Sequence, residues 1–484
     1  MANIVFVYRE EENLGVEYLS AVLRARGHTT ALVFDAKPRQ HFSARSREHY
    51  NRRADTMAER VAALQPDVVA FSTVTQDFIP FLAIAERVKQ RAPCFTVFGG
   101  VHPTAVREEL YTYRAIDFVA IGEGEHSLPA LADALDRGDM PVVPGIGINR
   151  PGYRHPIQDP AIVADLDDLP LPDKELFYGK QRYLARVYTI MASRGCPFKC
   201  SYCFHSFWRS GPKRVRRRSI GHIIDELAYA KKRFRPAVVW FLDDNFIGRP
   251  DWTMAFCDAY KHHVGIPFKA IIHPAFASGR AIEAMRQAGC VRVNFGVQTV
   301  NEELKRTVLN RSESNDQIRR CAQALHKSGI YFSIDHLFGI PGDSTANLDM
   351  AARFYNEIRP KAILNFFLTY YPGIPLVDYA RNKGLLDEHA IAEMRAGIVP
   401  DNMRGGSLTD QKEVTYYAFL FALLPALPAG LFARIIRGRW LKGLPYRFMA
   451  FLFLPRVLRA LANPISRLFL LRELRKRLPG GRIG

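Results

Sequence analysis

The chain has 484 residues, 48% hydrophobic and 24% charged, which suits roughly two or three folded domains and excludes wholesale disorder. Its formal net charge of +19 fits nucleic acid or an anionic membrane as a partner, and the position of that charge along the chain decides between them. The first residues run directly into a strand pattern without a basic segment or cleavage site, so we expect no signal peptide.

Apolar stretches typical of buried strands alternate with helical patterns over residues 1–145. The predicted strands cover residues 4–8, 30–34, 67–72, 94–98 and 118–121. The clearest helices cover residues 15–26, which end at Gly27, and 78–89. This alternation predicts an α/β domain with a doubly wound, Rossmann-like parallel sheet, whose ligands lie beyond the carboxyl ends of the strands.

Glycine and polar residues follow several of these predicted strands. The turns contain Ser72, Thr73 and Thr75, then Gly99, Gly100, His102 and Pro103, then Gly122, Glu123 and Gly124, while residues 13–15 follow the first strand. A glycine turn closes many α/β sheets, so each turn alone is a weak signal, whereas the ordered set favours a binding edge. His102 is equally well explained as an ordinary loop histidine.

A dense run of prolines between residues 143 and 182 predicts a linker over residues 146–185. Six strand-like stretches follow it at βα spacing, at residues 187–193, 238–243, 268–273, 291–298, 331–338 and 362–369. Helical patterns such as 220–233 and 315–327 separate them. Six βα units predict an open, partial (β/α)6 barrel over residues 186–395, with its chemistry at the carboxyl ends of the strands.

Three cysteines follow the first barrel strand within eight residues, at Cys196, Cys200 and Cys203. Three thiolates on one tight loop can each bind one iron of a [4Fe–4S] cluster, which leaves the fourth iron open to a small molecule. The alternative is structural zinc, which needs four ligands and would have to recruit His205, because no second pair of closely spaced cysteines is present. The sequence therefore favours the cluster and a reducing compartment.

Polar and glycine residues also end the later barrel strands. Asp243, Asp244 and Asn245 end the second strand, Gln298 ends the fourth and Gly339 ends the fifth. Strand ends are where the chemistry of such a barrel is expected. Structural roles remain open for them, Asp244 as a helix cap and Gln298 as a satisfied core amide.

The basic residues are concentrated late in the chain. Residues 431–484 carry 13 Lys and Arg and one acid, Glu473, which supplies +12 of the net +19. Apolar residues interleave with these arginines, so residues 396–484 are predicted to form a helical, basic and amphipathic region on a membrane surface. The uncharged stretch 414–433 is interrupted by prolines, which favours surface-lying packing over a true span. A helical cap over the barrel mouth is the alternative.

A second basic run lies at residues 213–218, just after the cysteine loop. Such a run is more often a solvated segment than a nucleic-acid site, although one arginine could pair with a carboxylate or phosphate of a ligand. No basic stripe with stacking aromatic residues lies near the predicted active site, so nucleic acid is not an expected partner.

The cysteine loop, with Tyr202 before its last cysteine, resembles that of radical S-adenosylmethionine (SAM) enzymes. The turns at 243–246, 296–298, 339–342 and 371–376 resemble further landmarks of that family. The resemblance implies that the open iron binds SAM and that one electron cleaves SAM to a 5′-deoxyadenosyl radical. It also implies that the carboxylates at 243–244 are candidates for the SAM amino group, that Gln298 lies near the ribose and that Gly339 borders the site. A strict Gly-Gly-Glu turn after the second strand is absent.

The turns of residues 1–145 resemble the cobalamin-binding domain that precedes many radical SAM modules. In that comparison the glycines let the backbone approach the flat macrocycle and the hydroxyls bond its amides. The Asp-x-His-x-x-Gly motif that supplies a cobalt ligand in other cobalamin enzymes is absent from this domain. The resemblance therefore implies that no histidine lies beneath the cobalt.

Together these features predict a cobalamin-dependent radical SAM enzyme that methylates an unactivated carbon of a hydrophobic or lipid-like substrate. It resembles hopanoid methylases, and we expect a flavodoxin- or ferredoxin-like electron donor and a cytoplasmic location at the inner face of the membrane. Three alternatives remain. They are a radical oxidative cyclase similar to the anaerobic Mg-protoporphyrin cyclase, a methylthio-transferring RNA enzyme, for which the other cysteines are too scattered to hold a second cluster, and a non-catalytic cobalamin-binding adaptor.

Overall fold

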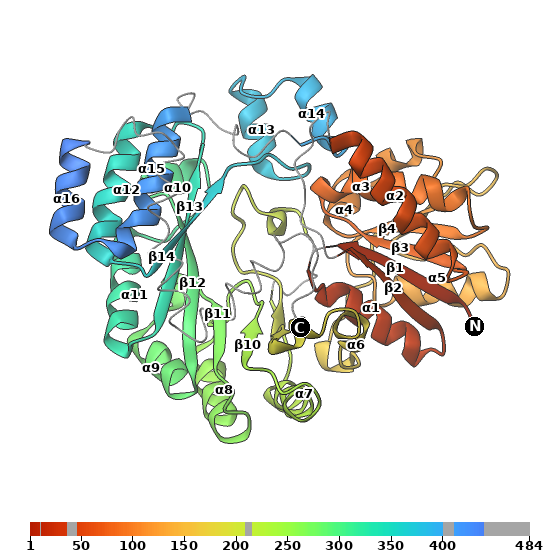
Figure 1. The fold of residues 1–484 in the computed structure, drawn as a ribbon, viewed down its shortest axis with the longest axis horizontal. Helices are drawn as coiled ribbons and strands as arrows, with labels where there is room; N and C mark the ends of the chain where they lie inside the picture. Colours follow the sequence, from red (N-terminus) through yellow and green to blue (C-terminus); the bar gives the residue numbers. More distant parts are fainter. Residues whose placement is uncertain (10, 36–45, 209–214, 400–410, 440–484) are drawn as a thin grey trace.

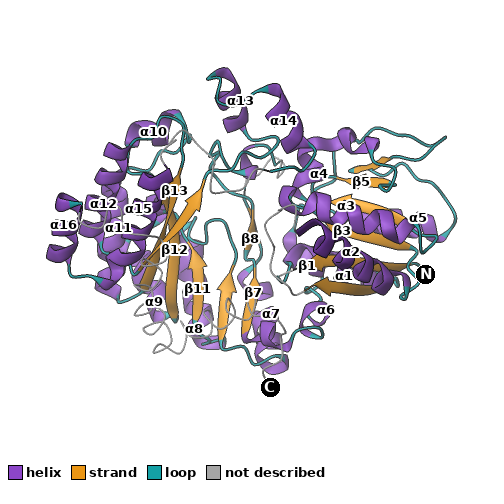
Figure 2. Ribbon diagram, turned by 45° about the horizontal axis from the view of Figure 1, so that its top comes forward, coloured by secondary structure: helices purple, strands orange, loops and turns teal. Residues whose placement is uncertain are grey.

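The structure is a computed structural model that describes residues 1–9, 11–35, 46–208, 215–399 and 411–439. Two six-stranded sheets lie side by side, each with helices packed against it (Figure 1). Seen from the second direction, the helices of the second sheet lie outside its strands (Figure 2).

The first sheet confirms the predicted parallel α/β domain. Its strands are β1 (Asn3–Arg9), β2 (Thr29–Asp35), β3 (Val68–Ser72), β4 (Phe95–Gly99), β5 (Phe118–Ala120) and β6 (Ile146–Ile148), in the order β2-β1-β3-β4-β5-β6. All pair in parallel except β6, which runs antiparallel to β5 and lies inside the predicted linker. A three-residue edge strand with a central glycine carries no alternation of apolar and polar residues, so the sequence did not reveal it.

Alternate residues of β1 enter two different cores, which is why helices cover both faces of this sheet. Ile4 and Phe6 pack in one core with α1 and α5, and Val5 and Val7 pack in another with α2 and α3. The helices are α1 (Leu14–Ala25), α2 (Ser46–Ala62), α3 (Thr75–Lys89), α4 (Val101–Val106) and α5 (Ser127–Asp136).

The second sheet confirms the predicted open barrel. Its parallel strands are β7 (Val187–Ile190), β10 (Val238–Phe241), β11 (Phe268–Ile271), β12 (Cys290–Gln298), β13 (Tyr331–Phe338) and β14 (Ala362–Phe367), in the order β14-β13-β12-β11-β10-β7. A short antiparallel pair, β8 (Ser193–Arg194) and β9 (Arg216–Arg217), brackets the cysteine loop. The remaining helices of this region are α6 (Glu175–Tyr178), α7 (Ile220–Arg233), α8 (Pro250–His263), α9 (Gly279–Gln287), α10 (Glu302–Thr307), α11 (Asn315–Ser328), α12 (Thr345–Ile358), α13 (Pro375–Asn382) and α14 (Glu388–Arg395).

The uncharged stretch 414–433 packs against the barrel. It forms most of α15 (Gln411–Leu423) and the start of α16 (Ala429–Gly438). Both helices contact α12, and α15 also contacts β14. The side chains of Tyr417 and Phe421 are buried there. Within the described residues, no helix combines the length and the apolar character needed to cross a bilayer. The interfacial helices predicted over residues 440–484 lie outside the described residues and stay a prediction.

A buried ammonium group joins the two sheets. Lys174 Nζ lies 2.7 Å from Glu12 Oε1 and 2.8 Å from Glu17 Oε2, and it donates to the Thr189 carbonyl oxygen at 2.8 Å. Glu12 and Glu17 lie at the start of the first domain, whereas Thr189 lies in β7 of the barrel. Burial, together with the neighbouring Glu12 charge, raises the pKa of Glu17 well above its usual range despite Lys174.

This ammonium group generates a stability prediction. Lys174→Ala should lower the free energy of unfolding by about 3–5 kcal/mol, because it leaves two buried carboxyl groups without their cation. Glu17→Gln should cost less, because the raised pKa already favours a neutral side chain of the same shape at that position. Urea unfolding of both variants measures the difference, and equal losses would contradict this account of the charge balance.

Candidate active site

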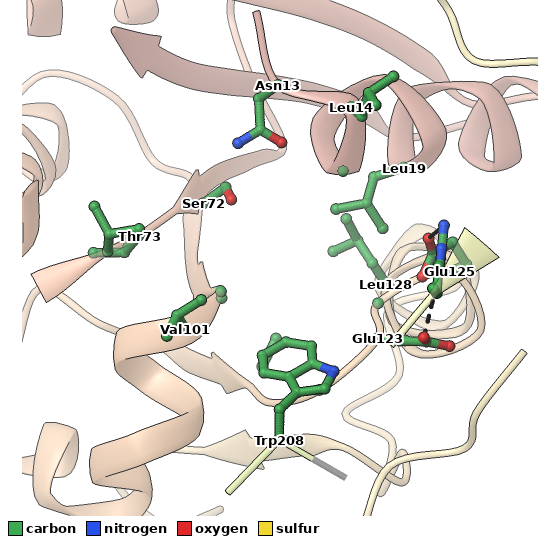
Figure 3. A pocket seen from close by; sticks show the side chains of 18 of the residues that line it. Asn13, Leu14, Leu19, Ser72, Thr73, Val101, Glu123, Glu125, Leu128 and Trp208 are labelled. Atoms are coloured by element: carbon green, nitrogen blue, oxygen red, sulfur yellow. Dashed lines mark hydrogen bonds and ion pairs between the residues drawn. The ribbon is translucent and has the colours of Figure 1, made fainter. Parts of the chain in front are cut away.

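The carboxyl ends of the two sheets face each other across one cavity of about 490 Å³. The first domain contributes the residues after β1, β3, β4 and β5, and the barrel contributes those after β7 and β10 with both flanks of the cysteine loop. Figure 3 shows Leu19, Val101, Leu128 and Trp208 around this space, with the polar side chains of Asn13 and Ser72 at its edge. The cavity is therefore mostly apolar and is shared by both domains.

Eight of the predicted cofactor-binding residues line this cavity, namely Ser72, Thr73, Gly99, Gly100, Gly122, Glu123, Gly124 and Asp244. Gly100 shows why a glycine is needed there. Its φ is +102°, and a Cβ atom at this position would lie 2.8 Å from the backbone N and O atoms of Thr73. The turn after β4 consequently packs against the turn after β3 through backbone atoms, and no side chain lies between Gly100 and Thr73.

Seven predicted residues lie outside the cavity lining, namely Thr75, His102, Pro103, Asp243, Asn245, Gln298 and Gly339. His102 is fully buried in α4, where its Nδ1 lies 3.2 Å from Thr75 Oγ1 and its ring packs on Phe78. Burial lowers the pKa of His102 to about 4, so the imidazole is neutral. His102 and Thr75 thus lie behind the cavity wall.

The three consecutive polar residues after β10 have different roles. Two of them bond to the backbone of the barrel, and one faces the cavity. Asp243 is buried and accepts hydrogen bonds from the Ala192 N–H at 3.0 Å and from the Ser193 hydroxyl, and burial raises its pKa to about 6. Asn245 accepts from the His273 N–H at 2.9 Å. Asp244 instead faces the cavity, where it lies 2.7 Å from His205 Nε2.

The cysteine loop is fastened to the far end of the barrel by its backbone. The Ser201 N–H donates to the Leu309 carbonyl at 3.0 Å, the Leu376 N–H donates to the Ser201 carbonyl at 3.1 Å, and Asn310 Nδ2 donates to the Lys199 carbonyl at 2.7 Å. These contacts come from the segments after β12 and β14. The loop therefore keeps one position over the open end of the barrel.

The donor set of this loop fits an iron–sulfur cluster. Cys196, Cys200 and Cys203 are half-buried and free of disulfides. Burial raises the pKa of Cys196 to about 12 and that of Cys203 to about 11, and the neighbouring thiols add to both shifts. Among the described residues no three His, Cys, Asp or Glu side chains form a ready site for a single metal ion. A four-iron cluster does not need such convergence, because each thiolate binds a different iron.

A charged network that the sequence analysis missed lies beside the loop. Arg311 donates to Glu313 at 2.7 Å, to the Tyr202 hydroxyl at 2.9 Å and to the Gly296 carbonyl at 2.9 Å, and its Nη1 lies 3.9 Å from Cys200 Sγ. Burial would raise the pKa of Glu313, but a hydrogen bond with His273 and the Arg311 charge lower it to about 2. The network holds a fixed cation next to the cysteine loop.

Gln298 lies where the register between β12 and β13 shifts, with a left-handed φ of +62°. Its side chain folds back over Gly296, where a Cβ atom would lie 2.4 Å from Gln298 Nε2. On the same two strands, Asn294 donates to both carboxylate oxygens of Asp335 at 3.0 Å, and burial raises the pKa of Asp335 to about 6. Gly339 follows β13 with φ +81°. Gln298 and Gly339 thus both have a left-handed backbone conformation, and neither lines the cavity.

Comparison with known proteins identifies both domains. Residues 190–355 match the radical SAM superfamily and residues 3–132 match the B12 binding domain. This chain is a radical SAM enzyme with a B12-binding domain. Its cofactors are a [4Fe–4S] cluster, SAM and cobalamin, as predicted.

Several known proteins are similar to this radical SAM enzyme over half or more of its length or close to half. The anaerobic magnesium-protoporphyrin IX monomethyl ester cyclase of Rubrivivax gelatinosus is 24% identical over 84% of this chain and 73% of its own length. The hopanoid C-3 methylase of Methylococcus capsulatus is 30% identical over 49% of this chain and 43% of its own length. The structure of the radical SAM methyltransferase TsrM from Kitasatospora setae, with cobalamin and a [4Fe–4S] cluster bound, has a TM-score of 0.63 at 15% identity and covers 79% of this chain and 78% of its own.

The cavity of the radical SAM enzyme fits cobalamin on two observations. The walls at residues 99–101 and 122–124 present glycine backbone where a flat macrocycle needs close approach. Among the described residues that line the cavity, the single imidazole is His205, which comes from the barrel side and pairs with Asp244. The first domain therefore offers no lining histidine to the cobalt, in keeping with the missing Asp-x-His-x-x-Gly motif.

The cysteine loop generates a direct test. Replacing any one of Cys196, Cys200 or Cys203 by alanine should abolish both the iron–sulfur absorbance and 5′-deoxyadenosine formation, because the cluster loses one of its three protein ligands. Cys321→Ala, in the buried face of α11, is the matched control and should retain both signals. A motif variant that still forms 5′-deoxyadenosine from SAM would contradict the assignment.

Proposed function

We propose that this enzyme methylates an unactivated carbon of a hydrophobic substrate. The observation that carries the proposal is the mostly apolar cavity between the glycine-lined edge of the first domain and the flanks of the cysteine loop. With cobalamin at the glycine-lined edge, a substrate in the part of this cavity next to the cysteine loop lies between the two cofactor sites. Such placement is what a transfer between two cofactors requires, because the reacting atoms must lie within a few ångströms of each other.

The side chains around the cavity suit an apolar substrate. Leu19 and Leu128 come from the first domain and Trp208 comes from the barrel side, so the substrate is enclosed by apolar surface from both. When bound, the cluster and SAM supply hydrogen-atom abstraction, and cobalamin supplies the methyl group. The protein's part is to orient the substrate carbon and to exclude water, and no lining acid or base is needed to move a proton from that carbon.

Arg311 has a separate part in the proposal. Its guanidinium lies at the cysteine loop with three hydrogen bonds that fix its orientation. A fixed guanidinium binds a carboxylate favourably, and SAM carries one on its methionine part. We therefore assign Arg311 to the SAM carboxylate. The SAM amino group keeps Asp244 as its candidate, because the side chains of Asp243 and Asn245 are already engaged in the barrel.

Oxidative cyclisation is the second candidate. It is favoured by the cyclase relative, whose similarity extends over 84% of this chain, against 49% for the hopanoid methylase. Both reactions use the same two domains and begin with hydrogen-atom abstraction, so the cavity geometry suits either. The products separate them, because only methylation converts SAM to S-adenosylhomocysteine.

Product analysis tests the proposal. Cells that express the protein and cells that lack it are fed methionine with a labelled methyl group, and their lipids and pigments are compared by mass spectrometry. The labelled product identifies the substrate. The unmethylated form of that compound is then incubated with the purified enzyme and SAM under anaerobic conditions. We expect S-adenosylhomocysteine and 5′-deoxyadenosine in about equal amounts, whereas 5′-deoxyadenosine alone would favour cyclisation.

We further propose that an acidic, flavodoxin-like protein reduces the cluster at a basic hollow beside the cysteine loop. A hollow of about 630 Å³ is lined by Pro197 of that loop and by Arg217 and Arg249. Within the described part of the chain, neither arginine has a carboxylate at ion-pair distance, and Arg217 rests on the Trp252 ring. Asp165 also lines the hollow, and its carboxylate accepts the Asp167 N–H. Two arginines without an ion-pair partner among the described residues suit an acidic partner.

Arg249→Glu should slow cluster reduction by reduced flavodoxin about ten-fold, because charge reversal at a docking rim lowers the association rate. Reduction by reduced methyl viologen, which needs no docking surface, should keep its rate. Stopped-flow bleaching of the cluster absorbance measures both. Arg353→Glu, on the exposed face of α12, controls for net charge, and equal flavodoxin rates for the two variants would refute the docking surface.

A further inference from the structure

Four charged side chains connect the cobalamin-binding domain to the two strands that bracket the cysteine loop. Glu123 and Glu125 lie in the turn after β5, Arg194 is the last residue of β8, and Arg216 is the first residue of β9. β8 and β9 pair antiparallel with Arg194 opposite Arg216, so the chain leaves and rejoins this pair around the cysteine loop. We call these four residues the clamp.

The contacts of the clamp are short and cross between the domains. Arg194 Nη2 donates to Glu125 Oε1 at 2.5 Å, and its Nη1 lies 3.6 Å from Glu123 Oε1. Arg216 donates to Glu123 through both terminal nitrogens. Its Nη1 donates to Oε2 at 2.9 Å, and its Nη2 donates to Oε1. The Val163 N–H also donates to Glu123 Oε2, at 3.0 Å. A bidentate guanidinium–carboxylate pair fixes angle as well as distance.

The clamp is buried and electrically balanced. The exposed fractions of the four side chains are 14% for Arg194, 6% for Arg216, 7% for Glu123 and 6% for Glu125. Burial alone would raise the pKa of Glu123, but the hydrogen bond from Arg216 and the charge of Arg194 hold it below its usual range. The Glu123 carboxylate is therefore held in its charged form, and no member of the clamp can move away without leaving a partner buried and unpaired.

All four side chains also line the shared cavity. Glu123 and Gly124 belong to the glycine turn that faces the cobalamin site, and Arg194 is two residues from Cys196. The same charged residues thus lie at the wall of the cobalamin site and at the start of the cysteine loop. A shift of the cysteine loop relative to the first domain would have to stretch these contacts first.

We propose that the clamp positions the [4Fe–4S] cluster at a fixed distance from cobalamin. Its members are positioning residues, since they act through the cysteine loop and the glycine turn. The inference rests on the proposed function, in which one substrate carbon must meet both cofactors. A fixed separation of the two centres is then a condition of the transfer.

The separation can be measured without a substrate. The reduced cluster and cob(II)alamin are both paramagnetic, so pulsed dipolar EPR spectroscopy of the reconstituted full-length protein reports their distance distribution. Glu125→Gln keeps the shape of the side chain and removes one charge of the clamp. We expect a distribution about two-fold broader than that of the natural protein, because the loop samples more positions once Arg194 loses the charge of its nearest partner.

Glu109→Gln is the matched control. Glu109 pairs with Arg395 of α14, so it is also a glutamate–arginine contact between the first domain and the barrel region, but it is half-exposed and its partner lies in neither β8 nor β9. Its distance distribution should equal that of the natural protein. Iron and cobalt contents are determined in every sample, so that cofactor loss is not mistaken for a change in distance.

Each outcome decides the proposal. An unchanged distribution in Glu125→Gln with full cofactor content overturns the clamp and leaves the proposed function intact. If Glu125→Gln loses a cofactor, the exchanged variant Glu125→Arg/Arg194→Glu decides, because a restored distance supports the clamp and a lasting loss overturns it. A natural protein that binds no cobalamin removes the proposed function, and the clamp with it.

Discussion

The structure depends on holding the loop-rich edges of two separate sheets against each other across one cavity. Apolar packing through α6 contributes, since Phe177 contacts Phe34 of β2 and Tyr178 contacts Tyr188 of β7. The more directional contacts are ionic. Lys174 is held between carboxylates of the first domain and β7, and Arg216 grips the turn after β5. Buried ion pairs add little net stability because of their desolvation cost, but they tolerate few alternative geometries. They suit an interface whose task is to fix a distance.

The basic run at 213–218 shows how a strand can distribute like charges. Arg216 and Arg218 turn to one side, where they meet Glu123 and Glu226, whereas Arg217 between them turns to the Trp252 ring. Alternation along an extended segment produces this division. The sequence alone predicts a solvated run, because spacing along the chain cannot show which acidic residues arrive from other domains. Within the described part of the run, the prediction of a solvated segment is wrong for Arg216 and Arg218, which pair with carboxylates of the protein and not with those of a ligand.

Much of the fold could be predicted from the sequence because its signals are local. Buried parallel strands are short apolar runs, and five strands of the first sheet and six of the second were found in this way. The cysteine loop was equally local. β6 was missed because it is an edge strand of three residues, and Arg311 was missed because it lies in a loop between α10 and α11. Its role arises from contacts with Tyr202 and Gly296, which only the folded chain brings together.

Two neighbouring carboxylates show where pattern recognition ends. Asp243 and Asp244 follow the same strand, and a motif cannot say which of them meets a ligand. The strand places Asp243 inward, where it takes the Ala192 N–H and the Ser193 hydroxyl at the start of the segment that leads to the cysteines. Asp244, the next residue, faces the cavity beside His205. Because the inward carboxylate shapes the approach to the cysteine loop, the conformation of that loop is set jointly by β7 and β10. The adjacent acid is left available to whatever binds between the two domains.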